Sequence, residues 1–173
     1  MKFLYENGYH IITFATLIHY LDGADELPAK PVIITFDDGW EDQFGYALPG
    51  LEKYHYSATF FVVTNFVGSP GFLSWSQLRR LLAEGMEIGS HSRSHPHLDK
   101  IKNPGILWDQ IYTANRSSRG NLGRLWTSLP THTVLTMPPL LPVSVGGAQE
   151  CPCVLRWPGS IGCVCAQSGN GSQ

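Results

Sequence analysis

The chain has 173 residues, a net charge of −2 with histidine neutral and 43% hydrophobic residues, which suits one domain with a sizeable core. The near-neutral charge gives no electrostatic basis for binding nucleic acid or an anionic membrane. No apolar run approaches the ~20 residues that a membrane span needs. The polar residues Glu6, Asn7 and His10 interrupt the first 21 residues, so no signal peptide is predicted there and the cellular location stays open.

Composition divides the chain near residue 113. Residues 1–113 carry every Phe and Tyr and most of the charge, whereas residues 114–173 carry all four Cys and are rich in Pro and Gly. The second part has five charged residues, namely Arg116, Arg119, Arg124, Glu150 and Arg156. Residues 1–113 are therefore predicted to form the folded domain, and residues 114–173 an irregular or disordered tail.

The first part is predicted to alternate between helices and strands. Apolar, β-branched and aromatic runs predict strands at residues 9–14, 32–36, 58–63 and 86–89. Helical spacing predicts helices at residues 2–7, 15–21, 41–53 and 75–84, the last with Ser74 as its N-cap and Gly85 as its stop. This alternation predicts an α/β fold with a parallel sheet or barrel.

The first candidate site is the segment T-F-D-D-G at residues 35–39, at the end of the most strand-like run. The carboxyl ends of strands form the edge at which β/α folds place their sites. Because successive residues of an extended chain point in different directions, Asp37 and Asp38 can have different roles. The alternative is a simple turn, since Asp-Gly is a common turn pair, and taken alone this motif favours the turn.

The second candidate is the segment H-S-R-S-H-P-H at residues 91–97, which follows another predicted strand. Two histidines four residues apart, His91 and His95, can bind one metal if the backbone turns helically between them. A carboxylate from elsewhere would complete the ligand set and leave positions open for water. The alternative is a pair of ordinary surface histidines, which becomes less favourable beside a double Asp at the same edge.

These two motifs, in this order, resemble the polysaccharide deacetylase family, the NodB-homology domain of carbohydrate esterase family 4. The resemblance covers about residues 1–113 and includes Y-E-N-G-Y-H-I-I, P-V-I-I-T-F-D-D-G, A-T-F-F-V-V and L-S-W-S-Q-L-x-x-L. It implies an incomplete, distorted β/α barrel of the NodB-homology type. It also implies a hydrolase that removes N-acetyl groups from an N-acetylglucosamine-containing polymer.

The resemblance also implies roles for individual residues. Asp37 would be the general base, and Asp38, His91 and His95 would bind a divalent metal. Zinc is the metal expected, and such sites also accept other divalent ions. Ser92 would brace the histidine loop, and His97 has no metal role by the pattern. The polymer stays open among peptidoglycan, chitin-like chains and exopolysaccharide, and relatives usually act outside the cell or in its envelope.

The tail lacks the later motifs that the family requires. The resemblance implies a Pro-Tyr segment and a histidine that protonates the leaving amine, yet His132 is the only histidine in the tail and its surroundings do not match. An opening strand before residue 2 is also implied. The chain is thus predicted to be a truncated member with impaired activity, and a non-catalytic metal- or carbohydrate-binding remnant is the alternative.

A change of reading frame after about residue 113 is one hypothesis for the tail. In the shifted frame, Trp126 before Thr127 forces an Asp codon and Met137 before Pro138 forces an Ala codon. Residues 130–137 then permit Y-P-Y-G-A-Y-N, the missing Pro-Tyr segment, directly before that Ala. The competing interpretation is an authentic divergent tail.

The cysteines leave a third functional class open, namely an interaction module built around a zinc ion that the tail cysteines bind. The pairs C-P-C at residues 151–153 and C-V-C at residues 163–165 can make a four-thiolate zinc site or two disulfides. C-x-C is less typical of zinc sites than C-x-x-C, and no aromatic or charged framework surrounds the pairs. Accidental cysteines in an out-of-frame segment are the favoured interpretation.

Overall fold

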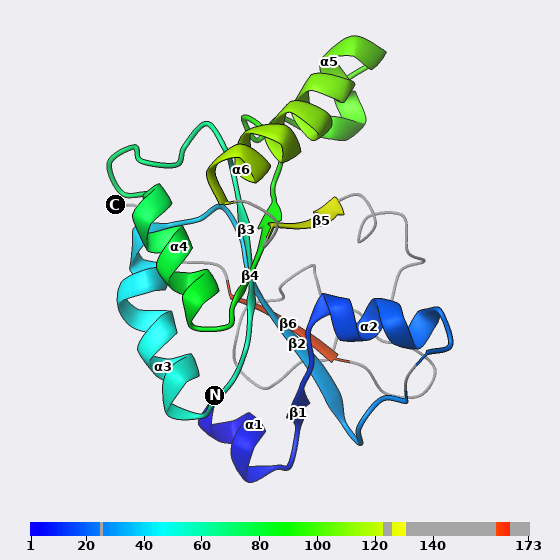
Figure 1. The fold of residues 1–173 in the computed structure, drawn as a ribbon, viewed down its shortest axis with the longest axis vertical. Helices are drawn as coiled ribbons and strands as arrows, with labels where there is room; N and C mark the ends of the chain where they lie inside the picture. Colours follow the sequence, from blue (N-terminus) through cyan, green and yellow to red (C-terminus); the bar gives the residue numbers. More distant parts are fainter. Residues whose placement is uncertain (25, 123–125, 131–161, 167–173) are drawn as a thin grey trace.

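The computed structural model describes residues 1–24, 26–122, 126–130 and 162–166 (Figure 1). Its centre is a parallel sheet in the order β1-β2-β3-β4-β5, with β6 also paired to β2. The strands are β1 His10–Ile11, β2 Pro31–Phe36, β3 Thr59–Val62, β4 Glu87–Ser90, β5 Trp126–Pro130 and β6 Gly162–Ala166. The fold is therefore α/β with parallel strands, as the alternating pattern predicts.

Helices cover both faces of this sheet. The α-helices are α1 Lys2–Glu6, α2 Phe14–Leu21, α3 Leu48–Lys53, α4 Trp75–Ala83, α5 Pro104–Trp108 and α6 Ala114–Leu122. Two π-helical turns, η1 Gln43–Ala47 and η3 Asp109–Thr113, precede α3 and α6, and a 3₁₀ turn η2 spans Leu98–Lys100. Figure 1 shows α3 and α4 on one side of the sheet and α2 on the other.

The core consists of two layers because β2 and β3 are buried on both faces. All six residues of β2 and all four of β3 are buried. Ile34 and Phe60 belong to the larger cluster, which α3 and α4 cover, whereas Ile33 and Phe61 lie in a smaller cluster under α2. Continuous apolar strands of this kind are typical of parallel sheets sandwiched between helices.

N-terminal caps explain where helices α2 and α4 begin, and the cap of α2 also explains where the first predicted strand ends. The predicted strand at residues 9–14 is shorter in the structure, because the Thr13 side chain accepts a hydrogen bond from the Thr16 backbone N–H (3.1 Å) and starts α2 at Phe14. The prediction of Ser74 as an N-cap is confirmed, since Ser74 and Gln77 form a reciprocal capping box at the start of α4.

The segment after residue 113 begins with ordered structure. An irregular tail was expected from residue 114, whereas Ala114–Leu122 form helix α6. Ala114, Ser118 and Leu122 are buried at a spacing of four residues, so one face of α6 packs against the domain. None of the helices in the described part of the chain is long and apolar enough to cross a bilayer.

Strand register places the two sequence motifs at one edge of the sheet. Phe36 at the end of β2 pairs with Phe60, and Val62 at the end of β3 pairs with Ser90 at the end of β4. The His91 backbone N–H donates to Val62 O (2.9 Å), and the Val63 N–H donates to Asp38 O (3.4 Å). The segments that follow β2 and β4 are thus both anchored to the end of β3.

Candidate metal centre

The T-F-D-D-G segment forms a tight turn directly after β2. Asp38 and Gly39 both adopt the left-handed backbone region, with φ of 69° and 82°. The turn is held by two hydrogen bonds to Asp37 O, from the Gly39 N–H (2.9 Å) and the Gln43 side chain (2.6 Å). A Cβ on Gly39 would lie 2.9 Å from Val62 Cγ1, so this position requires glycine for both its conformation and its packing.

The histidine loop, residues 91–98, follows β4 and is also strained. Ser92 and His95 have φ of 70° and 58°, so the backbone between His91 and His95 makes a compact non-helical turn. The helical turn that was the condition for these two histidines to converge is not the one that the structure uses. Ser92 Oγ accepts a hydrogen bond from the His95 backbone N–H (3.0 Å), which is the bracing contact that the resemblance implies.

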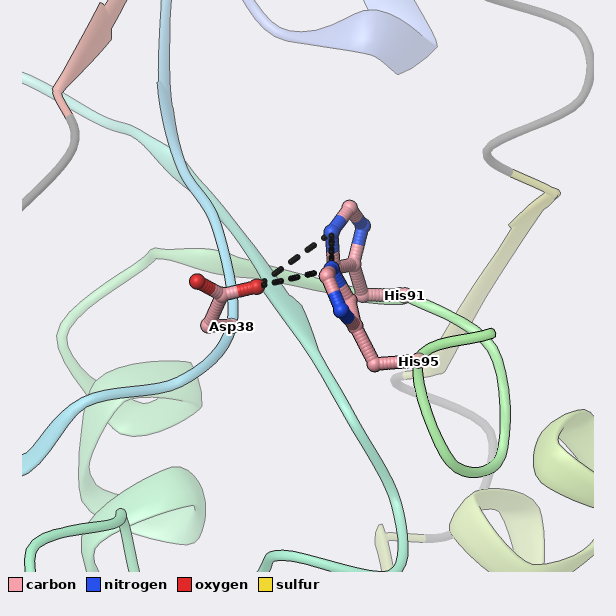
Figure 2. Close-up of side chains that lie close together, drawn as sticks. All are labelled: Asp38, His91 and His95. Atoms are coloured by element: carbon pink, nitrogen blue, oxygen red, sulfur yellow. Dashed lines mark hydrogen bonds and ion pairs between the residues drawn. The ribbon is translucent and has the colours of Figure 1, made fainter. Parts of the chain in front are cut away.

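The two turns bring Asp38, His91 and His95 together (Figure 2). Asp38 Oδ1 lies 3.4 Å from His91 Nε2 and 3.3 Å from His95 Nε2, and the two Nε2 atoms are 3.2 Å apart. A tetrahedral zinc with ligands at ~2.0–2.1 Å requires ligand atoms ~3.3–3.4 Å apart. The three atoms therefore have the spacing of one face of a tetrahedral site, and two imidazoles with a carboxylate suit zinc and related divalent ions.

Burial favours the neutral form of His91 that a metal ligand needs. Burial lowers the pKa of His91 from its ordinary value of 6.5. The negative charges of Asp37 and Asp38 act in the opposite direction and the neighbouring His95 reinforces the lowering. At neutral pH the His91 ring is thus mainly uncharged, with a lone pair available for a cation.

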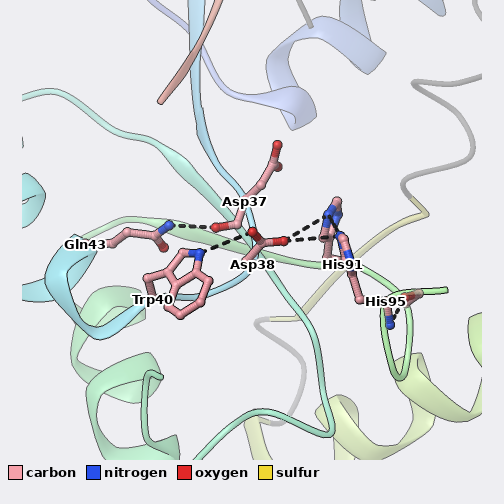
Figure 3. A network of polar contacts seen from close by, with 7 residues as sticks. Asp37, Asp38, Trp40, Gln43, His91 and His95 are labelled. Atoms are coloured by element: carbon pink, nitrogen blue, oxygen red, sulfur yellow. Dashed lines mark hydrogen bonds and ion pairs between the residues drawn. The ribbon is translucent and has the colours of Figure 1, made fainter. Parts of the chain in front are cut away.

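Trp40 is a site residue that the sequence motifs do not predict. Its Nε1–H donates to Asp38 Oδ2 (3.2 Å), which leaves Oδ1 directed at the histidines (Figure 3). The indole also stacks on Phe72, with ring centroids 4.4 Å apart. Trp40 therefore orients the carboxylate from behind, as outer partners of metal ligands commonly do.

The neighbouring carboxylates diverge. Figure 3 shows the Asp37 side chain pointing away from the Asp38 carboxylate, while its charge still acts on His91. Asp37 is therefore not part of the group formed by Asp38, His91 and His95.

Other candidate residues do not join this group. Within the described residues, Asp38, His91 and His95 form the one cluster of His, Cys, Asp and Glu with metal-binding spacing, and His97 is not part of it. His91 Nδ1 is buried and has no hydrogen-bond partner among the described residues.

The tail residues that the sequence singles out fall into two groups. His132, Cys151 and Cys153 lie outside the described residues. Cys163 and Cys165 lie on β6, paired in register with β2.

An α/β fold that carries an Asp-His-His group at the carboxyl ends of its strands defines a class of candidate metallohydrolases. The sequence model of polysaccharide deacetylases matches residues 24–129, more than half of the chain. The chain therefore belongs to the polysaccharide deacetylase family, as its motifs indicate. This match extends past residue 113, the predicted end of the resemblance, and includes α6.

Two of the relatives in sequence are named as deacetylases of N-acetylated sugars. The chain is 33% identical to a chitooligosaccharide deacetylase of a Bradyrhizobium species, over 60% of this chain and 44% of the relative. It is also 33% identical to a peptidoglycan-N-acetylglucosamine deacetylase of Listeria monocytogenes, over 64% of this chain and 24% of the relative. The chain thus spans less than half the length of these curated relatives.

Solved structures show the same fold. A Streptococcus pyogenes deacetylase, determined in complex with acetate, superposes with a TM-score of 0.67 and 25% identity over 71% of this chain and 55% of that one. A protein of Ammonifex degensii named IcaB superposes with a TM-score of 0.63 and 27% identity over 72% of this chain and 60% of that one. The predicted partial β/α barrel is therefore confirmed.

Proposed function

We propose that this chain is a metal-dependent polysaccharide deacetylase that removes N-acetyl groups from an N-acetylglucosamine-containing polymer. The observation that carries the proposal is the triangle of Asp38 Oδ1, His91 Nε2 and His95 Nε2, with edges of 3.2–3.4 Å. The relatives support the substrate class, since their names refer to chitooligosaccharide, peptidoglycan and poly-β-1,6-N-acetylglucosamine deacetylation. Zinc is the divalent metal that we propose for this site.

Each residue of the site has a distinct part in this proposal. Asp38, His91 and His95 hold the metal, and Trp40 keeps the Asp38 carboxylate aimed at it. A bound divalent metal polarises the acetamide carbonyl and lowers the pKa of water. Asp37, whose carboxylate is separate from the ligands, accepts the proton that the attacking water loses.

A non-catalytic metal- or carbohydrate-binding remnant is the second candidate. Two observations favour it. Within the described residues the cluster has three members, and the histidine acid that the resemblance implies is not identified among them. His91 Nδ1 is buried without a partner in that part of the chain, whereas metal-binding histidines usually donate this proton to an acceptor. Both observations predict weak metal binding and low turnover.

Acetate release distinguishes the two candidates. The purified chain, supplied with zinc or cobalt, is incubated with N-acetylglucosamine oligomers, and acetate is measured against a His91→Ala/His95→Ala double variant as control. Acetate release that requires both metal and the two histidines supports the deacetylase. Metal uptake without acetate release supports the remnant, and the absence of both contradicts the proposal as a whole.

A further inference from the structure

The π-helical turn η3 contacts the histidine loop at two points. Arg93 Nη1 donates to Asp109 Oδ2 (2.5 Å). Gln110 Oε1 accepts from the Ser94 backbone N–H (3.0 Å) and Ser94 Oγ (3.2 Å), and Gln110 Nε2 lies 3.0 Å from the same hydroxyl. Each contact joins residues 16 positions apart in sequence. The two loop residues, Arg93 and Ser94, stand between His91 and His95 in the sequence.

The Gln110 contact is the better protected of the two. The Arg93 and Asp109 side chains are 41% and 39% exposed, so their ion pair is screened by water and contributes little. Gln110 is only 9% exposed, although its neighbours Trp108 and Tyr112 on the same helical segment are 64% and 50% exposed. A buried amide that satisfies a backbone N–H is costly to remove, because the N–H then loses its partner.

Hydrogen bonds from two other parts of the chain hold the backbone of the histidine loop. Residues after β3 hold its first half, since the Thr64 and Asn65 N–H groups donate to Ser92 O (3.3 Å) and Arg93 O (3.0 Å). Ser94 is next in the chain, and His95 follows it with a φ of 58°, a conformation that persists only where surrounding contacts enforce it. Gln110 supplies such a contact from another element.

We propose that Gln110 is a positioning residue that holds the Ser94–His95 backbone so that the His95 ring stays within reach of Asp38 and His91. The proposal rests on the metal site of the proposed function. It extends that site beyond the two sequence motifs, to a π-helical turn, an element often found at functional sites. Gln110 acts through the loop and is not one of the three candidate ligands.

The chain offers a matched control. Gln77 Oε1 also accepts a serine backbone N–H and hydroxyl, from Ser74 at 2.8 and 2.7 Å, but at the start of α4. Gln110→Leu and Gln77→Leu therefore remove equivalent hydrogen bonds from different places. Gln110→Glu keeps the acceptor for Ser94 and serves as the conservative rescue, and it also covers the case in which Gln110→Leu fails to fold.

The test combines hydrogen exchange of the metal-free full chain with cobalt titration. In Gln110→Leu, we expect faster amide exchange at residues 94–95 and a cobalt Kd raised ~10–100-fold, the usual effect of losing an outer contact. Gln77→Leu should leave both unchanged, and Gln110→Glu should restore most of both. Unchanged loop exchange in Gln110→Leu, or equal effects from Gln77→Leu, overturns the proposal.

Failure of the proposed function gives a different result. If the wild-type chain binds no cobalt, the metal site is wrong, and the exchange measurement on the metal-free chain still decides whether Gln110 holds the loop. If the wild type and Gln110→Leu bind cobalt equally, the metal site stands and the positioning role is wrong.

Discussion

Asp37 and Asp38 are adjacent in sequence but have different surroundings. Asp38 uses one carboxylate oxygen for His91 and His95 and the other for Trp40. The Asp37 side chain points away from the Asp38 carboxylate, and the Asp37 backbone oxygen receives the Gln43 amide. Substitution of each Asp by Asn should therefore separate metal binding from proton transfer.

Asp37→Asn should retain metal and lose ~10²–10⁴-fold in acetate release, because an amide cannot accept the proton at neutral pH. Asp38→Asn should lose metal and activity together, because the carboxylate is a ligand. Metal content after dialysis and acetate release are measured on the same samples. Equal loss of metal in both variants contradicts the separate roles.

Trp40→Phe should weaken metal binding by about tenfold or more while the fold is maintained. The phenyl ring can still stack on Phe72, but the N–H that orients Asp38 is lost. Trp75→Phe, which makes the same chemical change at the start of α4, is the control and should bind metal as the wild type does. A Trp40→Phe chain with unaltered affinity shows that Asp38 needs no such support.

At the scale of the elements, β4 packs against β3 with no room for an added methyl group. A Cβ on Gly89 would lie 2.6 Å from two ring carbons of Phe61, and Phe61 belongs to the core under α2. Gly89→Ala should lower the free energy of unfolding by about 1–3 kcal/mol, the usual effect of overpacking. Urea unfolding measures this change.

Gly120→Ala in α6 is the matched control with the opposite expected sign. An added Cβ there has nothing within 4 Å, and alanine favours a helix more than glycine does. We expect a gain of about 0.4–1 kcal/mol. A loss of stability in Gly120→Ala contradicts the helix at Ala114–Leu122.

The sequence predicts the central elements well because burial and capping leave strong local patterns. The run V-I-I-T-F predicts β2, and Ser74 as an N-cap predicts the start of α4. Helix α6 is not predicted, because the residues that it buries include the small Ala114 and the polar Ser118, whose hydroxyl bonds Ala114 O (3.0 Å). Such a face has no apolar stripe to identify.

The site is predicted only in part, because a local motif identifies some of its residues and not others. The two motifs predict Asp38, His91 and His95, and the structure brings their side chains together. The contacts of Trp40 and Gln110 depend on left-handed residues in both turns and on packing between segments far apart in sequence. No spacing rule within one motif encodes those contacts.

At the scale of the whole molecule, the predicted change of reading frame can be tested directly. Helix α6 and the family match to residue 129 both continue past residue 113, so the boundary expected there lies inside the related region. We still predict that the coding DNA, read in the shifted frame, encodes Y-P-Y-G opposite residues 130–134. Nucleotide sequencing checks this, and an early stop codon in that frame contradicts it.

We propose that Asp38, His91 and His95 together bind one divalent metal. The most direct test is titration of the metal-free chain with zinc or cobalt, beside the His91→Ala/His95→Ala double variant and a variant with all four cysteines changed to serine. We predict one equivalent bound weakly by the wild type and the cysteine variant, and none by the double histidine variant. Equal uptake by the wild type and the double histidine variant, or loss of the metal with the cysteines, contradicts the claim.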